Sequence, residues 1–174
     1  MLTAGVHTNP DLVMKRELLG WLDAQRTHVA EQLMAMPSEA RRRSVVPSGW
    51  TPRGLIRHLT LDVERVWFRA VMAGERVDLP EGYAGWLAPD QQSDEELLAE
   101  YADECRRATA AVEDLALDAR PVWWFHDGGD PPHSSLREIL LHVIVETATH
   151  AGHLDICREM ADGGQRLVLD EPTT

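Results

Sequence analysis

Apolar residues recur every three or four positions in four stretches of this chain, at about 11–36, 52–74, 93–115 and 135–162. Because successive residues of an α-helix are rotated by about 100°, this spacing places the apolar side chains on one face of each helix. No convincing strand pattern lies between the four stretches. The pattern therefore predicts an all-α protein, an antiparallel four-helix bundle that forms a single domain over residues 1–174.

The starts of the predicted helices carry recognisable signals. Thr51 is an N-cap candidate that precedes Pro52, and proline is favoured at the first helical position. Ser93 is expected to cap the third helix, and Ser135 with Glu138 forms a capping box at the start of the fourth. These signals support the helix boundaries that the apolar pattern indicates.

Two connections rich in proline and glycine, residues 75–92 and 118–134, interrupt the helical pattern. Both are too long for tight turns, and the first is expected to cross one end of the bundle. Aromatic residues in or near these connections either wall a ligand pocket or fill the core. They are Trp50, Trp86, Trp123 and Trp124.

The composition narrows the function classes. Of the 174 residues, 44% are hydrophobic and 26% charged, as is typical of a soluble globular protein with one core. The formal net charge of −12 argues against nucleic acid and anionic membranes as partners. No apolar stretch approaches the roughly 20 residues of a membrane span and residues 1–10 lack a signal-peptide pattern, so a cytoplasmic location is expected. Cys105 and Cys157 lie within predicted helices and are expected to be reduced core residues.

Glu146 and His150 are the most informative pair in the chain. They are four residues apart in the fourth predicted helix, so their side chains lie on one face. That face belongs to, or borders, the apolar sector that contains Leu140 and Val143. A carboxylate that faces an apolar interior is costly unless it is paired or binds a metal. Two interpretations follow: a metal site, or a hydrogen-bonded glutamate–histidine couple inside the bundle.

His58, in the second predicted helix, is the candidate for a third metal ligand. Two imidazoles and one carboxylate suit Zn²⁺, with nickel and iron as alternatives, and leave a position open for water or substrate. Asp62 follows one turn later and could accept the second ring N–H of His58. His142 and His153 lie on one flank of the apolar sector, where they could support the ligands or face a substrate. Four arginines of these two helices could pair with an acidic substrate, namely Arg57, Arg65, Arg69 and Arg158.

Two better known metal motifs do not fit this chain. The order Glu-x-x-x-His differs from the His-Glu-x-x-His of zincin proteases. A ferritin-like di-iron site would need Glu-x-x-His motifs from two helices together with further glutamates, and no such doubled pattern occurs. Neither class of protein is therefore predicted.

The segments that contain these candidates resemble a known family. The second predicted helix and its approach contain Ser48-Gly49-Trp50-Thr51-Pro52, His58-Leu59-Thr60, Glu64-Arg65 and Trp67-Phe68. The fourth contains the run from Glu146 to Asp155, followed by Arg158-Glu159, and the first contains Leu19-Gly20-Trp21-Leu22. Together these segments resemble the DinB-like superfamily, specifically its DUF664 branch, and the resemblance covers nearly the whole chain.

The resemblance implies a four-helix bundle in which three side chains hold a divalent metal. The usual ligands in DinB-like proteins are three histidines, but Glu146 stands where the first histidine of the HxxxH pair is usual. The set of His58, Glu146 and His150 is therefore more similar to the zinc site of mycothiol-dependent maleylpyruvate isomerase and related thiol transferases. A counterpart of the additional C-terminal domain of that isomerase is not expected in this chain, so the isomerase substrate is not carried over. A low-molecular-weight thiol such as mycothiol and a homodimer are implied, and Glu64 matches a recurrent family position that could orient groups around the metal.

Three function classes follow from the residues and the resemblance. The first is a metal-dependent thiol S-transferase or thiol-dependent isomerase that acts on a small electrophile. The second is a metal-dependent hydrolase that uses activated water, and the third is a non-catalytic bundle that binds a metal or a ligand. Thiol consumption that is lost when His150 is replaced would distinguish the first class from the other two.

Overall fold

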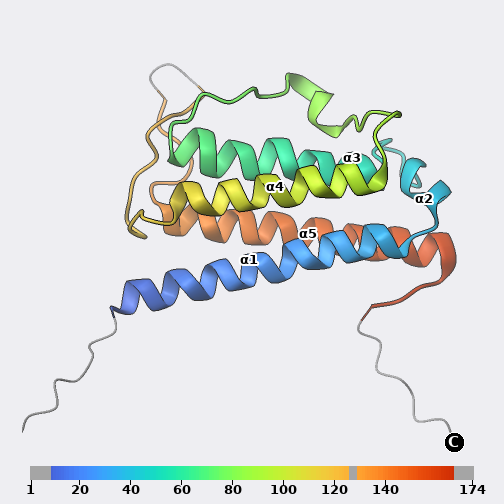
Figure 1. Ribbon diagram of the computed structural model, residues 1–174, viewed down its shortest axis with the longest axis horizontal. Helices are drawn as coiled ribbons and strands as arrows, with labels where there is room; N and C mark the ends of the chain where they lie inside the picture. The colour runs from blue at the N-terminus through green and yellow to red at the C-terminus, as the bar shows by residue number, and fades with distance from the viewer. Residues whose placement is uncertain (1–8, 126–128, 167–174) are drawn as a thin grey trace, which may run out of the picture.

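The computed structural model describes residues 9–125 and 129–166, and within these ranges it contains helices and no β-strand. The helices are α1 (Pro10–Ala35), α2 (Ser38–Arg42), α3 (Pro52–His58), η1 (Leu59–Met72), η2 (Gly82–Trp86), α4 (Asp94–Val112) and α5 (Leu136–Asp162). Because α3 runs directly into η1, there are four long helical segments, and they surround one hydrophobic core (Figure 1). The prediction of an all-α protein is confirmed.

The long helices do not all alternate in direction. Ion pairs join Asp11 to Arg137 and His28 to Asp155, so α1 and α5 run in the same direction. The α3–η1 segment and α4 also run in the same direction as each other, opposite to α1 and α5 (Figure 1). The expectation of an antiparallel arrangement is therefore wrong for these two pairs. The reason is the connection between η1 and α4, which returns along the helices and allows α4 to start beside the start of α3 (Figure 1).

The second long segment changes its winding directly after His58. It begins as predicted, with Pro52 as the first helical residue and Oγ1 of Thr51 accepting the N–H of Gly54 at 3.1 Å. Throughout η1, however, the chain is wound as a π-helix, in which hydrogen bonds span five residues instead of four. π-Helical turns are rare in proteins overall, but those that occur are often found at functional sites. Here the change of winding coincides with a candidate metal ligand.

The predicted apolar faces form the core. The apolar stripe of the second segment consists of five residues at helical spacing, and all are buried, namely Leu55, Leu59, Val63, Val66 and Ala70. In η1, residues outside that stripe are buried as well, among them Glu64 and Phe68. Cys105 and Cys157 are buried free thiols, as predicted. Within the described part of the chain, no helix combines the length and the apolar character that a membrane crossing requires.

The predicted caps are present, with one difference at the start of α5. Ser93 forms a complete capping box with Glu96 at the start of α4. At α5 the hydroxyl of Ser135 accepts the N–H of Glu138 at 3.4 Å, but the Glu138 carboxylate accepts the N–H of Ser134, at 2.6 Å, in place of that of Ser135. This backbone hydrogen bond, and after it one from the Ser134 hydroxyl, lowers the pKa of Glu138. The reciprocal half of the box is therefore shifted by one residue.

Candidate metal centre

Three side chains from two helical segments converge at the predicted site. His58 is the last residue of α3, and Glu146 and His150 lie one turn apart on α5. The Nε2 atoms of His58 and His150 lie 3.6 Å and 3.3 Å from Oε1 of Glu146. One ligand atom from each residue lies within 4.8 Å of the other two, which is the arrangement that three protein ligands of one metal ion require.

The surroundings of His58 fit a metal ligand. Its Nδ1 atom lies 2.8 Å from Oδ2 of Asp62, which occupies one of the two ring nitrogens. Its Nε2 atom is buried and has no hydrogen-bond partner among the residues that the structure describes. Buried polar atoms rarely stay unpaired, and a free imidazole nitrogen directed at Glu146 and His150 is a donor that divalent cations such as Zn²⁺ favour. His58, Glu146 and His150 therefore offer ligand atoms that suit one metal ion, and the Asp62 carboxylate supports His58.

His150 is held in the neutral form that can bind a metal. Burial is the largest cause that lowers the pKa of His150, and the nearby His58 lowers it further. Glu146 raises the same pKa, but by less. Its Nδ1 atom lies 3.3 Å from Nδ1 of His153, so one of the two rings can donate to the other. His153 itself is exposed. It therefore lies at the solvent side of the site, beside a ligand but outside the group of three.

Trp86 closes one side of the site. Its ring stacks on His58 with a centroid separation of 4.0 Å and contacts His150 edge-on at 5.6 Å. It comes from η2, in the connection that returns along the helices. The preceding residue, Gly85, leaves space for Asp62, because a Cβ atom at position 85 would lie only 2.1 Å from Oδ2 of Asp62. The sequence pattern indicated a wall or core role for Trp86 but carried no signal for Gly85.

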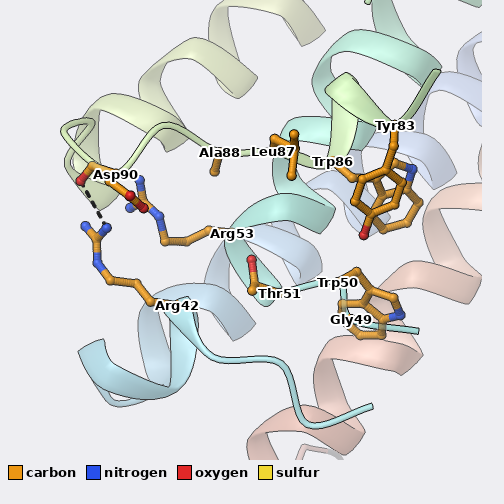
Figure 2. A pocket seen from close by; sticks show the side chains of 10 residues that line it. All are labelled: Arg42, Gly49, Trp50, Thr51, Arg53, Tyr83, Trp86, Leu87, Ala88 and Asp90. Atoms are coloured by element: carbon orange, nitrogen blue, oxygen red, sulfur yellow. Dashed lines mark hydrogen bonds between the residues drawn. The ribbon is translucent and has the colours of Figure 1, made fainter. Parts of the chain in front are cut away.

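A small cavity of about 200 Å³ lies on the outer side of this tryptophan. Trp86 and Tyr83 form one wall of it and Trp50 another, while Arg42 lies at the opposite end (Figure 2). Trp50 connects the cavity with the site, because its ring lies 6.4 Å from that of Trp86 and 5.9 Å from that of His153. The cavity is therefore separated from His58 by a single indole ring.

His142 lies beside the site on α5, one turn before Glu146. Its ring packs against Trp67 at 4.7 Å and against His133 at 4.6 Å. Burial is the largest cause that lowers the pKa of His142, and the nearby His133 lowers it further. The imidazole is therefore neutral at neutral pH. His142 thus lies next to the candidate ligands but is not one of them.

The other polar candidates of the sequence lie elsewhere. Arg158 donates to Oε1 of Gln32 on α1 at 3.2 Å. Arg65 and Arg69 both bind Glu104 of α4, and Arg57 lies 3.8 Å from Glu100. Glu64 does not support the site, because it is buried against α1, where it accepts two hydrogen bonds from Arg26 at 2.7 and 2.5 Å. These groups are therefore engaged within the protein, away from the three converging ligand atoms.

The fold and the site define a class of protein: an all-helical chain in which two histidines and a glutamate converge at a spot that suits a divalent metal. A family model described as Mycothiol-S-transferase matches residues 17–163. The chain therefore belongs to the mycothiol-S-transferase family, and the resemblance to the DinB-like superfamily is confirmed. Comparisons with curated proteins and with solved structures found no match.

Proposed function

We propose that this protein is a metal-dependent thiol S-transferase that joins a low-molecular-weight thiol, in the first instance mycothiol, to a small electrophile. His58, Glu146 and His150 hold a divalent cation, which we expect to be zinc, with nickel and iron as the alternatives. The observation that carries this proposal is the buried Nε2 atom of His58, which has no hydrogen-bond partner within residues 9–125 and 129–166 and lies 3.6 Å from the Glu146 carboxylate. Membership of the mycothiol-S-transferase family supports the choice of thiol chemistry.

The cation, when bound, would lower the pKa of a coordinated thiol so that the thiolate nucleophile is available at neutral pH. The protein residues supply the remaining functions. Asp62 accepts the Nδ1–H of His58 and so directs Nε2 toward the site. Trp86 covers one face of the His58 ring and excludes water from it.

His142 is our candidate for the group that accepts the thiol proton. It is one helical turn from Glu146, and its lowered pKa keeps it neutral and able to take up a proton. In the transfer, the S–H bond of the thiol breaks and its proton passes to His142. The sulfur electron pair forms a bond to the electrophilic carbon, and the leaving group departs with the electron pair of its own bond to that carbon.

The cavity beside Trp86 is our candidate for holding the part of a substrate that does not react. Its indole and phenol rings, from Trp50, Trp86 and Tyr83, offer apolar faces, and Arg42 offers a positive charge for an acidic group. His153 lies at the edge of this region and could contact the same molecule. We expect a small-molecule substrate, no nucleic-acid or membrane partner, and a cytoplasmic location.

The first test is the metal content of the purified, untagged protein, measured by elemental mass spectrometry. Near-stoichiometric zinc, nickel or iron is expected in the wild type and should be lost in His58→Ala, Glu146→Ala and His150→Ala. The matched control is His28→Ala, because His28 is a partly buried histidine whose partner, Asp155, lies outside the site. Wild-type protein that stays metal-free after incubation with divalent ions would overturn the proposed site.

The second test is thiol consumption with an electrophile, assayed with the metal-loaded protein. A rate that requires the thiol and disappears in His150→Ala supports S-transfer. Turnover of an ester or amide without any thiol would instead identify a hydrolase that activates water. A metal-loaded protein that turns over neither kind of substrate would identify a non-catalytic binding protein.

A further inference from the structure

A groove runs along the junction of α1 and α4, which lie side by side in the bundle (Figure 1). It consists of two adjoining cavities of about 410 and 310 Å³, each large enough for a small molecule. Four residues line both cavities, namely Asp23, Arg26, Cys105 and Arg106. The two cavities therefore meet at Arg26 and form one groove with two lobes.

Small side chains explain why α1 and α4 leave this space. Ala110 lines the first lobe, and Ala30 and Ala102 line the second. A methyl group cannot fill the space that a larger apolar side chain would occupy between two helices. Leu19 and Leu98 add apolar surface, one in each lobe. Leu19 and Ala30 are eleven residues apart on α1, so the groove is about 16 Å long and suits an extended apolar molecule.

The floor on which the two lobes meet is polar, and its buried cation is already neutralised. The Arg26 guanidinium donates two hydrogen bonds to Glu64, at 2.7 and 2.5 Å. Its Nη1 atom also donates to Asp23 at 2.7 Å and to the Thr109 hydroxyl at 3.0 Å. A ligand anion would meet these two carboxylates, and a ligand cation would meet the guanidinium. The floor therefore favours a neutral molecule.

Tyr101 is a wall residue of the second lobe, and its hydroxyl is unpaired. The residue is 2% exposed, and its hydroxyl oxygen has no hydrogen-bond partner within the described part of the chain. Burial, and after it the nearby Cys105 and Glu64, raises the pKa of Tyr101, so the hydroxyl keeps its proton. Burial also raises the pKa of the Cys105 thiol, which keeps its proton as well. Buried polar groups rarely stay unpaired, so these donors favour a ligand with an acceptor oxygen.

We infer that the groove between α1 and α4 is a binding site for a neutral, mainly apolar small molecule with one carbonyl oxygen near its middle. The oxygen accepts the Tyr101 hydroxyl, and an apolar arm lies in each lobe, where it is removed from water. The oxygen is placed near the middle because Tyr101 lies beside Cys105, which lines both lobes. The inference does not rest on the proposed function, because the three candidate metal ligands belong to α3 and α5.

Titration calorimetry of the whole chain with dipentyl ketone gives the first test. This probe is neutral and has an apolar arm on each side of its oxygen, and we expect saturable binding of one molecule per chain. Ala102→Phe and Ala110→Phe each fill one lobe and should abolish this binding. Both positions are exposed, as is Ala99, which lies outside the groove on the same helix. Ala99→Phe is therefore the matched control and should bind as the wild type does. No binding up to the solubility of the ketone, or equal affinity in the two groove variants, would overturn the inference.

Tyr101→Phe tests the polar contact, because it keeps the ring and removes only the hydroxyl. The affinity for dipentyl ketone should fall about 2- to 10-fold, which corresponds to one hydrogen bond. The affinity for pentylbenzene, which has no oxygen, should stay unchanged, and the ligand-free variant should unfold at the wild-type temperature. Decanoate, which carries a charge, should bind the wild type more weakly than the ketone does. Equal losses for both neutral probes would reduce Tyr101 to a packing role, and tighter binding of decanoate would refute a site for neutral molecules.

Discussion

The Nδ1 atom of His58 lies 2.8 Å from Oδ2 of Asp62, and this contact determines which nitrogen of the ring faces the candidate metal centre. A carboxylate that accepts the Nδ1–H fixes the tautomer, so that the lone pair resides on Nε2. Both residues belong to the segment in which the α-helix changes to a π-helix. Asp62 thus links the local winding of the chain to the availability of a ligand atom.

Asp62→Ala should weaken zinc binding without removing a ligand. Loss of a carboxylate that supports a metal-bound histidine typically costs about 10- to 100-fold in metal affinity. The affinity can be measured by competition with a chromophoric chelator. Asp103→Ala is the matched control, because Asp103 is a surface carboxylate that pairs with Arg106 and Arg107, away from the site. An unchanged zinc affinity in Asp62→Ala would show that the hydrogen bond does not orient His58.

Gly85→Ala should weaken zinc binding through the same carboxylate. The added methyl group would lie 2.1 Å from Oδ2 of Asp62, so the carboxylate or the η2 backbone must move. Because the change acts through Asp62, the double variant Gly85→Ala with Asp62→Ala should bind zinc no more weakly than Asp62→Ala alone. Gly20→Ala is the control, since a Cβ atom there meets nothing within 4 Å. Strictly additive losses in the double variant would refute this coupling.

The sequence predicts the candidate ligands of this site better than the residues that enclose them. His58, Glu146 and His150 could be identified because helical spacing sets which side chains share a face, and the structure brings these three together. Trp86 and Gly85 lie in an irregular connection, where no periodicity relates a residue to its neighbours in space. The same connection determines that α4 runs parallel to α3–η1. No local sequence pattern predicts the course of this connection.

Glu64 illustrates a second limit of the sequence pattern. At about 100° per residue it falls off the apolar stripe of its helix, which favours a solvent or outer position. The π-winding of η1 changes the angular positions, and the residue is instead buried against Arg26. A helical wheel assumes one winding throughout, so it cannot predict this pair.

Glu64→Gln should destabilise the fold strongly. The substitution removes the buried partner of the Arg26 guanidinium and leaves only the exposed Asp23 carboxylate as a counter-charge. Loss of one partner of a buried ion pair typically costs about 3–5 kcal/mol. Chemical denaturation would measure the loss. Asp23→Asn is a matched control on the same arginine: Asp23 accepts from Arg26 at 2.7 Å but is 65% exposed, so less than about 1 kcal/mol is expected. The double variant Arg26→Met with Glu64→Leu should recover part of the stability, and equal losses in Glu64→Gln and Asp23→Asn would contradict this account.

The metal-free protein should lose stability as the pH falls below about 6.5, the ordinary pKa of histidine. The pKa values of His142 and His150 are lowered in the folded state, first by burial and then by a neighbouring histidine. Below the ordinary value the unfolded chain takes up protons that the folded chain does not, so the free energy of unfolding decreases. Above it, both states are neutral at these residues and their contribution is constant. Unfolding measured between about pH 7.5 and about pH 5 should show this slope, and the double variant His142→Gln with His150→Gln should flatten it. An equal slope in that variant would assign the effect to other groups.

His142→Gln should reduce the transfer rate while the metal stays bound. General-base catalysis by a positioned side chain contributes about 10²- to 10⁴-fold, and glutamine keeps a polar side chain of similar reach but cannot take up the thiol proton. The loss should appear in kcat at saturating thiol, with the zinc content equal to that of the wild type. His133→Gln provides the comparison. Burial would still lower the pKa of His142, but removal of His133 should relieve the smaller part of the lowering and shift the acidic limb of the pH–rate profile to higher pH without abolishing activity. Full activity in His142→Gln would exclude this residue as the proton acceptor and leave the role to solvent or to Glu146.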